Sequence, residues 1–169
     1  MKNYLTTFYL LTFLLYHQVT TAAESSPFEQ LPPVYLEKFE RLDNLKRETL
    51  KNYYGSTMAI AIFGINCSWC KKQHRMLKKL QNECPNFNIV MMGIGRDKQK
   101  LNTDLKRNQN KFPAFKINNN LLSALNNENV PRLILFDPKG NAKLNLLGYT
   151  NKIKLLSLLD QQLGFQCQG

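Results

Sequence analysis

Short apolar runs, separated by polar and turn-forming residues, mark the expected strands of this chain. Most of these runs are rich in Ile, Leu, Val, Met or Phe and lack an intervening charge. Uninterrupted runs of this length are typical of strands that are buried on both faces. We predict strands at residues 58–63, 88–92, 132–136 and 143–147. Between the last two, Asp137-Pro138-Lys139-Gly140 predicts a hairpin turn.

Longer stretches, in which apolar residues recur every three or four positions, mark the expected helices. Asp97 and Asn151 are suited to cap two of them at their N-termini. Residues 112–120 contain Pro113 and three consecutive asparagines, so we expect them to be irregular. The predicted helices cover residues 34–54, 71–83, 97–108, 121–125 and 151–163.

The order of these elements predicts the fold class. Strands that alternate with helices need parallel crossovers, whereas the hairpin turn makes the last two strands antiparallel. We therefore predict an α/β fold with a mixed central sheet, helices on both of its faces, and an extra N-terminal helix at 34–54.

The first residues have the layout of a secretory signal peptide. Lys2 is positive, residues 5–16 form an uncharged apolar block, and Thr21-Ala22-Ala23 offers small residues for cleavage. A retained membrane anchor is the alternative, although the apolar block is short for a membrane span. We predict a signal peptide at 1–23 cleaved near Ala23, an extended leader and N-terminal helix at 24–55, and one domain at 56–169.

The chain is strongly basic, with 23 Lys and Arg against 12 Asp and Glu and a formal net charge of +11. Such a charge suits nucleic acid, an anionic membrane surface or acidic proteins. No nucleic-acid-binding motif accompanies it, and the lysines are spread along the chain. We therefore predict no nucleic-acid partner, and a membrane contact only if the signal peptide stays uncleaved.

The motif Cys67-Ser68-Trp69-Cys70 carries the candidate chemistry. It stands between the strand at 58–63 and the helix at 71–83, which places Cys67 at a helix N-terminus. Unpaired backbone N–H groups and the helix dipole favour a thiolate there, and the thiolate is the species that attacks disulfides. The spacing therefore predicts a catalytic pair, Cys67 and Cys70, that cycles between dithiol and disulfide.

A metal site and a purely structural disulfide are the alternatives for this pair. Zinc needs four nitrogen or sulfur ligands, but after the predicted signal peptide only His74, Cys84 and Cys167 remain, at no recognised spacing. Haem attachment needs a histidine directly after the second cysteine, where this chain has Lys71. A disulfide across so short a loop removes little chain entropy and would be a weak staple. We predict no metal and no cofactor.

From residue 56 to 163 the chain resembles the thioredoxin superfamily. The matching features are the strand, Cys67-Ser68-Trp69-Cys70 and helix in succession, the Val130-Pro131 dipeptide before a strand, and the final hairpin and helix. The resemblance implies a thioredoxin-like three-layer sandwich. It also implies a cis peptide bond before Pro131, which would lie against the redox pair. Val130 and Pro131 would then bind an incoming client peptide.

Two positions depart from the family pattern. Cytoplasmic thioredoxins carry a buried acid six residues before the first cysteine and an aromatic residue directly before it; this chain has Ala61 and Asn66 there. Without the acid, Cys70 has no obvious proton carrier. Asn66-Cys67-Ser68 also matches the glycosylation acceptor pattern, and a glycan at that place would block the site. A bacterial periplasm therefore suits the chain better than a eukaryotic secretory pathway.

Two roles are open for Trp69, inside the motif: it contacts a substrate chain or it covers the disulfide. The nearest positive charges on the following helix, such as Lys71 and Lys72, would favour the Cys67 thiolate. We assign Lys78 and Lys79, two turns further along, to a solvated helix face.

The thioredoxin arrangement also bears on Cys84 and Cys167. In that arrangement the redox helix and the last helix share a face and run away from the active end, so their C-terminal ends can meet. We hypothesise a structural disulfide between Cys84 and Cys167, provided that their Cα atoms lie about 4.4–6.8 Å apart. Otherwise Cys84 is a small buried side chain and Cys167 lies on a loose tail.

Together these features predict a periplasmic thiol–disulfide oxidoreductase, with the direction of exchange left open. Its partners would be thiol- or disulfide-containing client proteins of the envelope and a redox-recycling protein. The layout is also similar to that of thioredoxin-like assistants of conjugative and type IV secretion systems. The alternative function is therefore a redox-inactive thioredoxin-fold binding or adaptor module of an envelope secretion or conjugation complex.

Overall fold

A computed structural model of the chain describes residues 32–126 and 128–167. The predicted signal peptide at 1–23 lies outside the described residues. In the part that is described, no helix combines the length and the apolar character needed to cross a membrane.

A mixed sheet forms the centre of the fold. Its strands are β1 (Phe39–Arg41), β2 (Arg47–Glu48), β3 (Met58–Gly64), β4 (Asn88–Ile94), β5 (Ala114–Lys116), β6 (Arg132–Phe136) and β7 (Ala142–Leu147). They lie in the order β2-β1-β5-β4-β3-β6-β7. β4 pairs in parallel with both β3 and β5, and all other neighbours are antiparallel.

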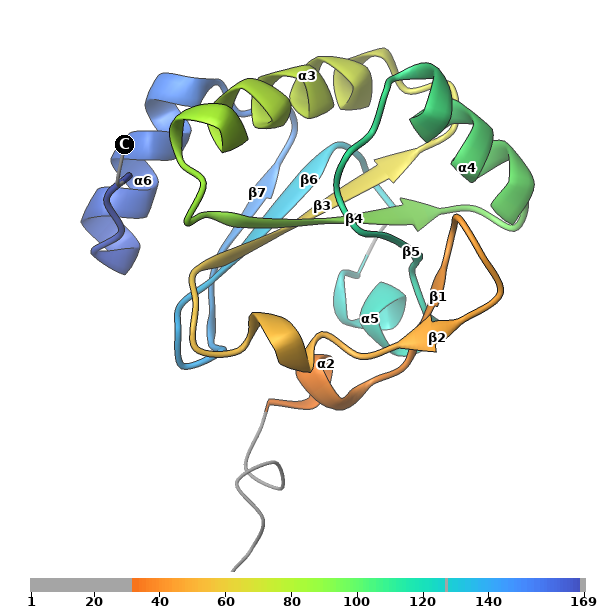
Figure 1. Ribbon diagram of the computed structural model, residues 1–169, viewed down its shortest axis with the longest axis horizontal. Coiled ribbons are helices and arrows are strands. Elements are labelled where there is room, and N and C mark those ends of the chain that lie inside the picture. Colours follow the sequence, from red (N-terminus) through yellow and green to blue (C-terminus); the bar gives the residue numbers. More distant parts are fainter. Residues whose placement is uncertain (1–31, 127, 168–169) are drawn as a thin grey trace, which may run out of the picture. The chain divides into compact units, whose positions relative to one another are not determined.

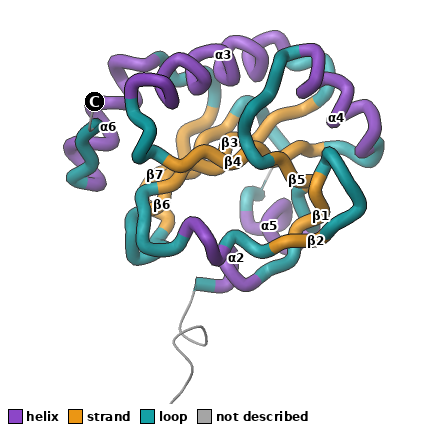
Figure 2. The backbone as a smooth tube through the Cα atoms, viewed as in Figure 1, coloured by secondary structure: helices purple, strands orange, loops and turns teal. Residues whose placement is uncertain are grey.

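Helices cover both faces of this sheet. They are α2 (Pro33–Leu36), the 3-10 helix η1 (Lys51–Tyr53), α3 (Ser68–Glu83), α4 (Lys98–Arg107), α5 (Asn119–Ala124) and α6 (Lys152–Leu163). Figures 1 and 2 show α3, α4 and α6 over one face, and α2 and α5 over the other. The fold is therefore the predicted three-layer α/β sandwich, with a mixed sheet between two helical layers.

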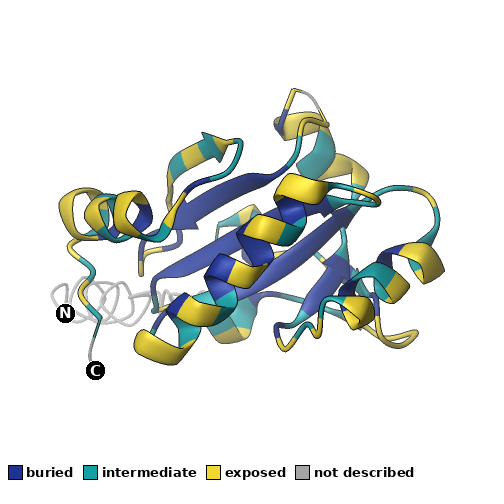
Figure 3. Cartoon of the chain, turned by 90° about the horizontal axis from the view of Figure 1, so that it is seen from above, coloured by how far each residue is buried: buried dark blue, intermediate teal, exposed yellow. Residues whose placement is uncertain are grey.

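The central strand β3 explains why the strand runs lack polar positions. Ala59, Ala61 and Phe63 point into the hydrophobic cluster beneath α3, α4 and α6. Met58, Ile60 and Ile62 point into the cluster on the other face. Because successive side chains of a strand alternate between faces, a strand covered on both sides must be apolar at every position. Figure 3 shows the same division, since the central strands are buried while the covering helices are exposed on their outer side.

Most of the predicted elements are confirmed. The strands predicted at 58–63, 88–92, 132–136 and 143–147 correspond to β3, β4, β6 and β7. The helices predicted at 71–83, 97–108, 121–125 and 151–163 correspond to α3, α4, α5 and α6. Asp97 and Asn151 cap α4 and α6, because each side chain accepts a hydrogen bond from a backbone N–H three residues later.

The predicted helix at 34–54 is wrong. Only α2 is helical at its start, and β1 and β2 then form a hairpin before the 3-10 helix η1. The hairpin bends at Asn44, whose side chain accepts a hydrogen bond from the N–H of Lys46. Arg41 on β1 forms ion pairs with Glu48 on β2 and with Asp43 in the turn. β1 also pairs with β5, so the sheet satisfies backbone groups that a helix would have paired internally.

The prediction that residues 112–120 are irregular is wrong at Ala114–Lys116. These residues form strand β5, which joins β1 to the parallel strand β4. Phe115 on this strand is buried and packs edge-on against Phe39 of β1. Pro113 and the asparagines mask this short strand in the sequence, because its stability comes from pairing with β1 and β4 rather than from its own residues.

Candidate active site

The two cysteines of the motif lie where β3 gives way to α3. Cys67 is the N-cap of α3, and its sulfur accepts a hydrogen bond from the N–H of Cys70 over 3.1 Å. Asn66, directly before it, has a φ of 58°, a left-handed backbone conformation that asparagine tolerates better than most residues. The chain thereby turns from the strand into the helix and leaves the first cysteine at its N-terminus.

Cys67 and Cys70 form a disulfide, with their Cα atoms 5.1 Å apart. The two residues differ in exposure: Cys67 is half-buried, whereas Cys70 is only 5% exposed. An incoming sulfur therefore reaches Cys67 more readily than Cys70. Cys67, the more accessible cysteine, is also the one at the helix N-terminus, which favours a thiolate.

The Val130-Pro131 dipeptide lies at the same end of the sheet. β6 runs antiparallel to β3 with Arg132 opposite Ile62, which brings the dipeptide alongside the last residues of β3. A Cβ placed on Gly64, three residues before Cys67, would lie 3.4 Å from a Val130 methyl group. The Val130–Pro131 peptide bond is cis. The structure therefore brings this dipeptide and the redox motif to one end of β3.

Trp69 projects from the motif and is 57% exposed. Its ring packs against the ring of Tyr149, with centroids 5.9 Å apart. The Lys72 ammonium lies over both rings, 4.8 Å from the Trp69 centroid and 4.6 Å from that of Tyr149. An aromatic surface capped by a cation thus lies beside the redox pair.

The loop that carries Tyr149 is fixed to α3. Gln73, which is buried, donates a hydrogen bond from Nε2 to the carbonyl oxygen of Thr150 and accepts one at Oε1 from its N–H. Gly148 on the same loop donates its N–H to the carbonyl oxygen of Pro131 over 2.8 Å. The helix, the loop after β7 and the loop before β6 are therefore joined around the motif.

The buried acid that cytoplasmic thioredoxins carry before the first cysteine has no counterpart at its usual position. Ala61 occupies that position and is buried in the cluster beneath α3.

The buried titratable residue on the redox helix is His74, one helical turn after Cys70. Its Nε2 bonds Asn110 Oδ1 at 2.9 Å, and burial lowers its pKa. Lys71 pairs with Asp104 across 3.6 Å.

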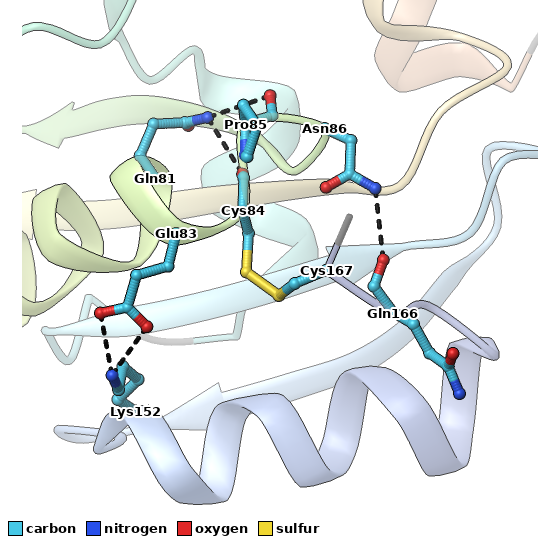
Figure 4. Close-up of a disulfide and its surroundings, with 8 residues drawn as sticks. All are labelled: Gln81, Glu83, Cys84, Pro85, Asn86, Lys152, Gln166 and Cys167. Atoms are coloured by element: carbon cyan, nitrogen blue, oxygen red, sulfur yellow. Dashed lines mark hydrogen bonds and ion pairs between the residues drawn. A yellow bond between two sulfur atoms is a disulfide. The ribbon is translucent and has the colours of Figure 1, made fainter. Parts of the chain in front are cut away.

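Cys84 and Cys167 are not part of this site. They form a second disulfide at the far end of α3, with their Cα atoms 4.7 Å apart (Figure 4). α3 has 16 residues, so the two disulfides are separated by about 24 Å along the helix. Asn86 donates a hydrogen bond to the carbonyl oxygen of Gln166 beside this bridge, and it helps to hold the C-terminal tail in place (Figure 4).

Sequence reasoning missed three residues around the motif: Gln73, Tyr149 and Thr150. Gln73 is a polar residue on the inner face of a helix, and a buried amide needs hydrogen-bond partners. That signal was present in the sequence, because Gln73 falls three positions before Met76 and four before Leu77, which puts it on the apolar face of the helix. The partner could not be found in this way, since Thr150 lies 77 positions later in the chain.

Comparison with known proteins gives a consistent picture of the fold. A family model described as thioredoxin-like matches residues 55–142. No curated protein matches the chain. Among solved structures, dsbF of Mycobacterium tuberculosis is similar, with 12% identity, a TM-score of 0.65, and 74% of this chain and 93% of that chain covered.

Two further solved structures are similar at comparable levels. The thioredoxin domain of a Bacteroides vulgatus thiol-disulfide oxidoreductase has 17% identity and a TM-score of 0.61, covering 74% of this chain and 91% of that one. A secreted Mycobacterium tuberculosis disulfide oxidoreductase homologous to E. coli DsbE has 12% identity and a TM-score of 0.59, covering 70% and 88%. At these identities the likeness shows a shared fold.

Proposed function

This chain belongs to the thioredoxin-like family, and on that premise we propose that it exchanges disulfides with client proteins through Cys67 and Cys70. The observation that carries the proposal is the placement of the pair. Cys67 is accessible at the N-terminus of α3, whereas its partner Cys70 is buried one turn into the helix. A nucleophile must meet its client, and a resolving thiol must be shielded until the client is attached.

In the reducing direction, the Cys67 thiolate attacks one sulfur of a client disulfide. A bond between Cys67 and the client forms as the client's own S–S bond breaks, and the other client sulfur leaves as a thiolate. The Cys70 thiolate then attacks the Cys67 sulfur, which closes the internal disulfide and releases the second client thiolate. The same steps in reverse deliver a disulfide to a client dithiol.

We assign client binding to Trp69, Val130 and Pro131. Trp69 supports this role because it lies within the motif and its side chain is largely exposed. Val130 and Pro131 support it because they lie at the end of β3 and are joined to the Tyr149 loop through Gly148. An extended client segment would lie between these two groups.

We further propose that the exchange takes place in a bacterial periplasm, with envelope proteins as clients. The signal-peptide layout of residues 1–23 supports this compartment, and one of the similar solved structures is of a secreted protein. Each turnover leaves the Cys67–Cys70 pair in the opposite oxidation state. An external electron donor or acceptor must therefore restore the pair, and we propose a redox-recycling protein rather than a bound cofactor for this role.

A turnover assay tests the proposal. The purified protein should reduce insulin disulfides with a dithiol as electron donor, and a Cys67→Ser variant should lose this activity while keeping its fold by circular dichroism. The oxidised protein is tested in parallel for delivery of a disulfide to a peptide dithiol. If the folded wild-type protein exceeds the Cys67→Ser variant in neither assay, the exchange function is overturned and the redox-inactive adaptor role takes its place.

A further inference from the structure

A cation lies over two aromatic rings beside the redox pair. Trp69 and Lys72 come from the first turns of α3, whereas Tyr149 comes from the loop after β7. The Lys72 ammonium lies within 5 Å of both ring centroids. Attraction to the ring faces holds the charge in place without neutralising it.

Hydrogen bonds fix the position of this platform, which consists of the Trp69 and Tyr149 rings and the Lys72 ammonium, on the helix that begins at Cys67. Gln73 ties the Tyr149 loop to α3 through the two hydrogen bonds with Thr150, which measure 3.2 and 2.8 Å. Lys72 and Trp69 lie on the same helix as Gln73, so these hydrogen bonds hold the Tyr149 loop against the helix that carries the other two side chains. A client that reaches Cys67 therefore meets the ammonium at a defined place.

In the described part of the chain, no carboxylate balances the charge of Lys72. Lys71, its neighbour, pairs with Asp104. Within residues 32–126 and 128–167, by contrast, Lys72 makes no ion pair with an Asp or Glu. Lys72 is exposed, so its ammonium remains open to a charge on an incoming chain.

From these observations we propose that Lys72, Trp69 and Tyr149 form a subsite selecting client segments that carry an acidic side chain beside the reacting cysteine. The client carboxylate pairs with the Lys72 ammonium, while the apolar part of the segment lies along the exposed aromatic surface. This inference rests on the proposed exchange function and names its substrate class. The subsite positions the client and takes no part in bond making or breaking.

Two model peptides, each of which holds its cysteine in a disulfide, test this specificity. The peptides are identical except for Glu or Lys next to the cysteine, and their exchange with the reduced wild-type protein is followed at low ionic strength. We expect the Glu peptide to react about fivefold faster, because an exposed ion pair contributes modestly and the Lys peptide adds repulsion. The ratio should shrink at high salt, since surface charges are then screened.

Variants of the platform locate the source of the preference. Lys72→Gln should bring the ratio of the two rates close to one, Lys72→Glu should reverse it, and Lys72→Arg should retain it because Arg keeps the charge and stacks on rings. Lys79→Gln, an exposed position further along the same helix, is the matched control and should keep the wild-type ratio.

A neutral small disulfide, hydroxyethyl disulfide, separates the two proposals. If the wild-type protein exchanges with it but reacts equally fast with the Glu and Lys peptides, the acidic-client subsite is overturned and the exchange function stands. The same conclusion follows if Lys72→Gln retains the wild-type preference. If there is no exchange with the neutral disulfide at all, both proposals fall.

Discussion

The side-chain amide of Gln73 makes two hydrogen bonds with the backbone of Thr150: Nε2 donates to the carbonyl oxygen, and Oε1 accepts from the N–H. The two residues are 77 positions apart in the chain, and both are buried. The contact joins the redox helix to the loop that carries Tyr149. The geometry of the active site therefore depends on a residue that carries no charge and no reactive group.

Replacing Gln73 with Met should lower the free energy of unfolding by about 1–3 kcal/mol, because the Thr150 N–H and carbonyl groups would be left buried and unpaired. Urea denaturation monitored by circular dichroism measures the change. Gln99→Ala, at an exposed position of α4, is the control and should change stability by less than about 0.5 kcal/mol. An equally small change for Gln73→Met would mean that the contact does not hold the loop.

The roles of the two motif cysteines can be separated by trapping. A Cys70→Ser variant should accumulate mixed disulfides with clients through Cys67, because the thiol that resolves them has been removed. A Cys67→Ser variant should accumulate far fewer, since Cys70 is buried. Non-reducing electrophoresis followed by mass spectrometry identifies the linked cysteine. More adducts on Cys70 than on Cys67 would reverse the assignment.

The second disulfide should contribute stability but not exchange activity. The cysteines it joins are 83 positions apart, so the chain-entropy model gives a contribution on the order of 4 kcal/mol. A Cys84→Ala/Cys167→Ala double variant should therefore unfold at lower urea concentration while it still reduces insulin. The bridge lies at the opposite end of α3 from Cys67, which is the reason to expect this separation. Loss of insulin reduction in a folded double variant would assign the bridge a part in electron transfer.

His74 should make the protein less stable at mildly acidic pH. Burial is the largest effect and lowers its pKa below the usual 6.5, and the charges of Lys78 and Arg75 lower it further. The hydrogen bond with Asn110 and the charge of Asp104 oppose this shift. Below about pH 6.5 the unfolded chain then binds a proton that the folded chain does not, so the free energy of unfolding falls as the pH decreases.

Unfolding free energies measured at pH 7 and pH 5 test this contribution. His74→Gln should lose less stability between the two pH values than the wild type does, whatever its absolute stability. The difference between the two losses isolates His74 from the carboxylates, which titrate in both proteins. An equal loss in the two proteins would contradict a lowered pKa for this imidazole.

The fold was predictable from sequence where burial dictates the residue pattern. β3, β4 and β6 are buried on both faces, so their apolar runs could be recognised directly. The region around Leu45 was not predictable in this way. Its spacing from Leu42 suggested one helix face, yet Leu45 is 89% exposed at the hairpin, while Leu42 is buried. Pairing of β1 with β5 overrides the helical periodicity, and such pairing leaves no local signal.

The residues of the active site also differ in whether the sequence could predict them. Cys67 and Cys70 were recognisable because their spacing and their place before a helix have a direct chemical meaning. Tyr149 was not, since it joins the site through Trp69 and Lys72 after the chain has returned along β6 and β7. A contact between residues so distant in sequence depends on the tertiary fold, which a single sequence does not display.

Redox titration with thiol trapping tests the central claim most directly. The wild-type protein is equilibrated in dithiol–disulfide buffers of stepped potential, alkylated and analysed by mass spectrometry. We predict that the Cys67 and Cys70 thiols appear together in one two-electron transition, with about 30 mV per tenfold change in ratio, while the protein stays folded and Cys84 remains bonded to Cys167. A Cys67–Cys70 pair that opens only when the protein unfolds would contradict the account.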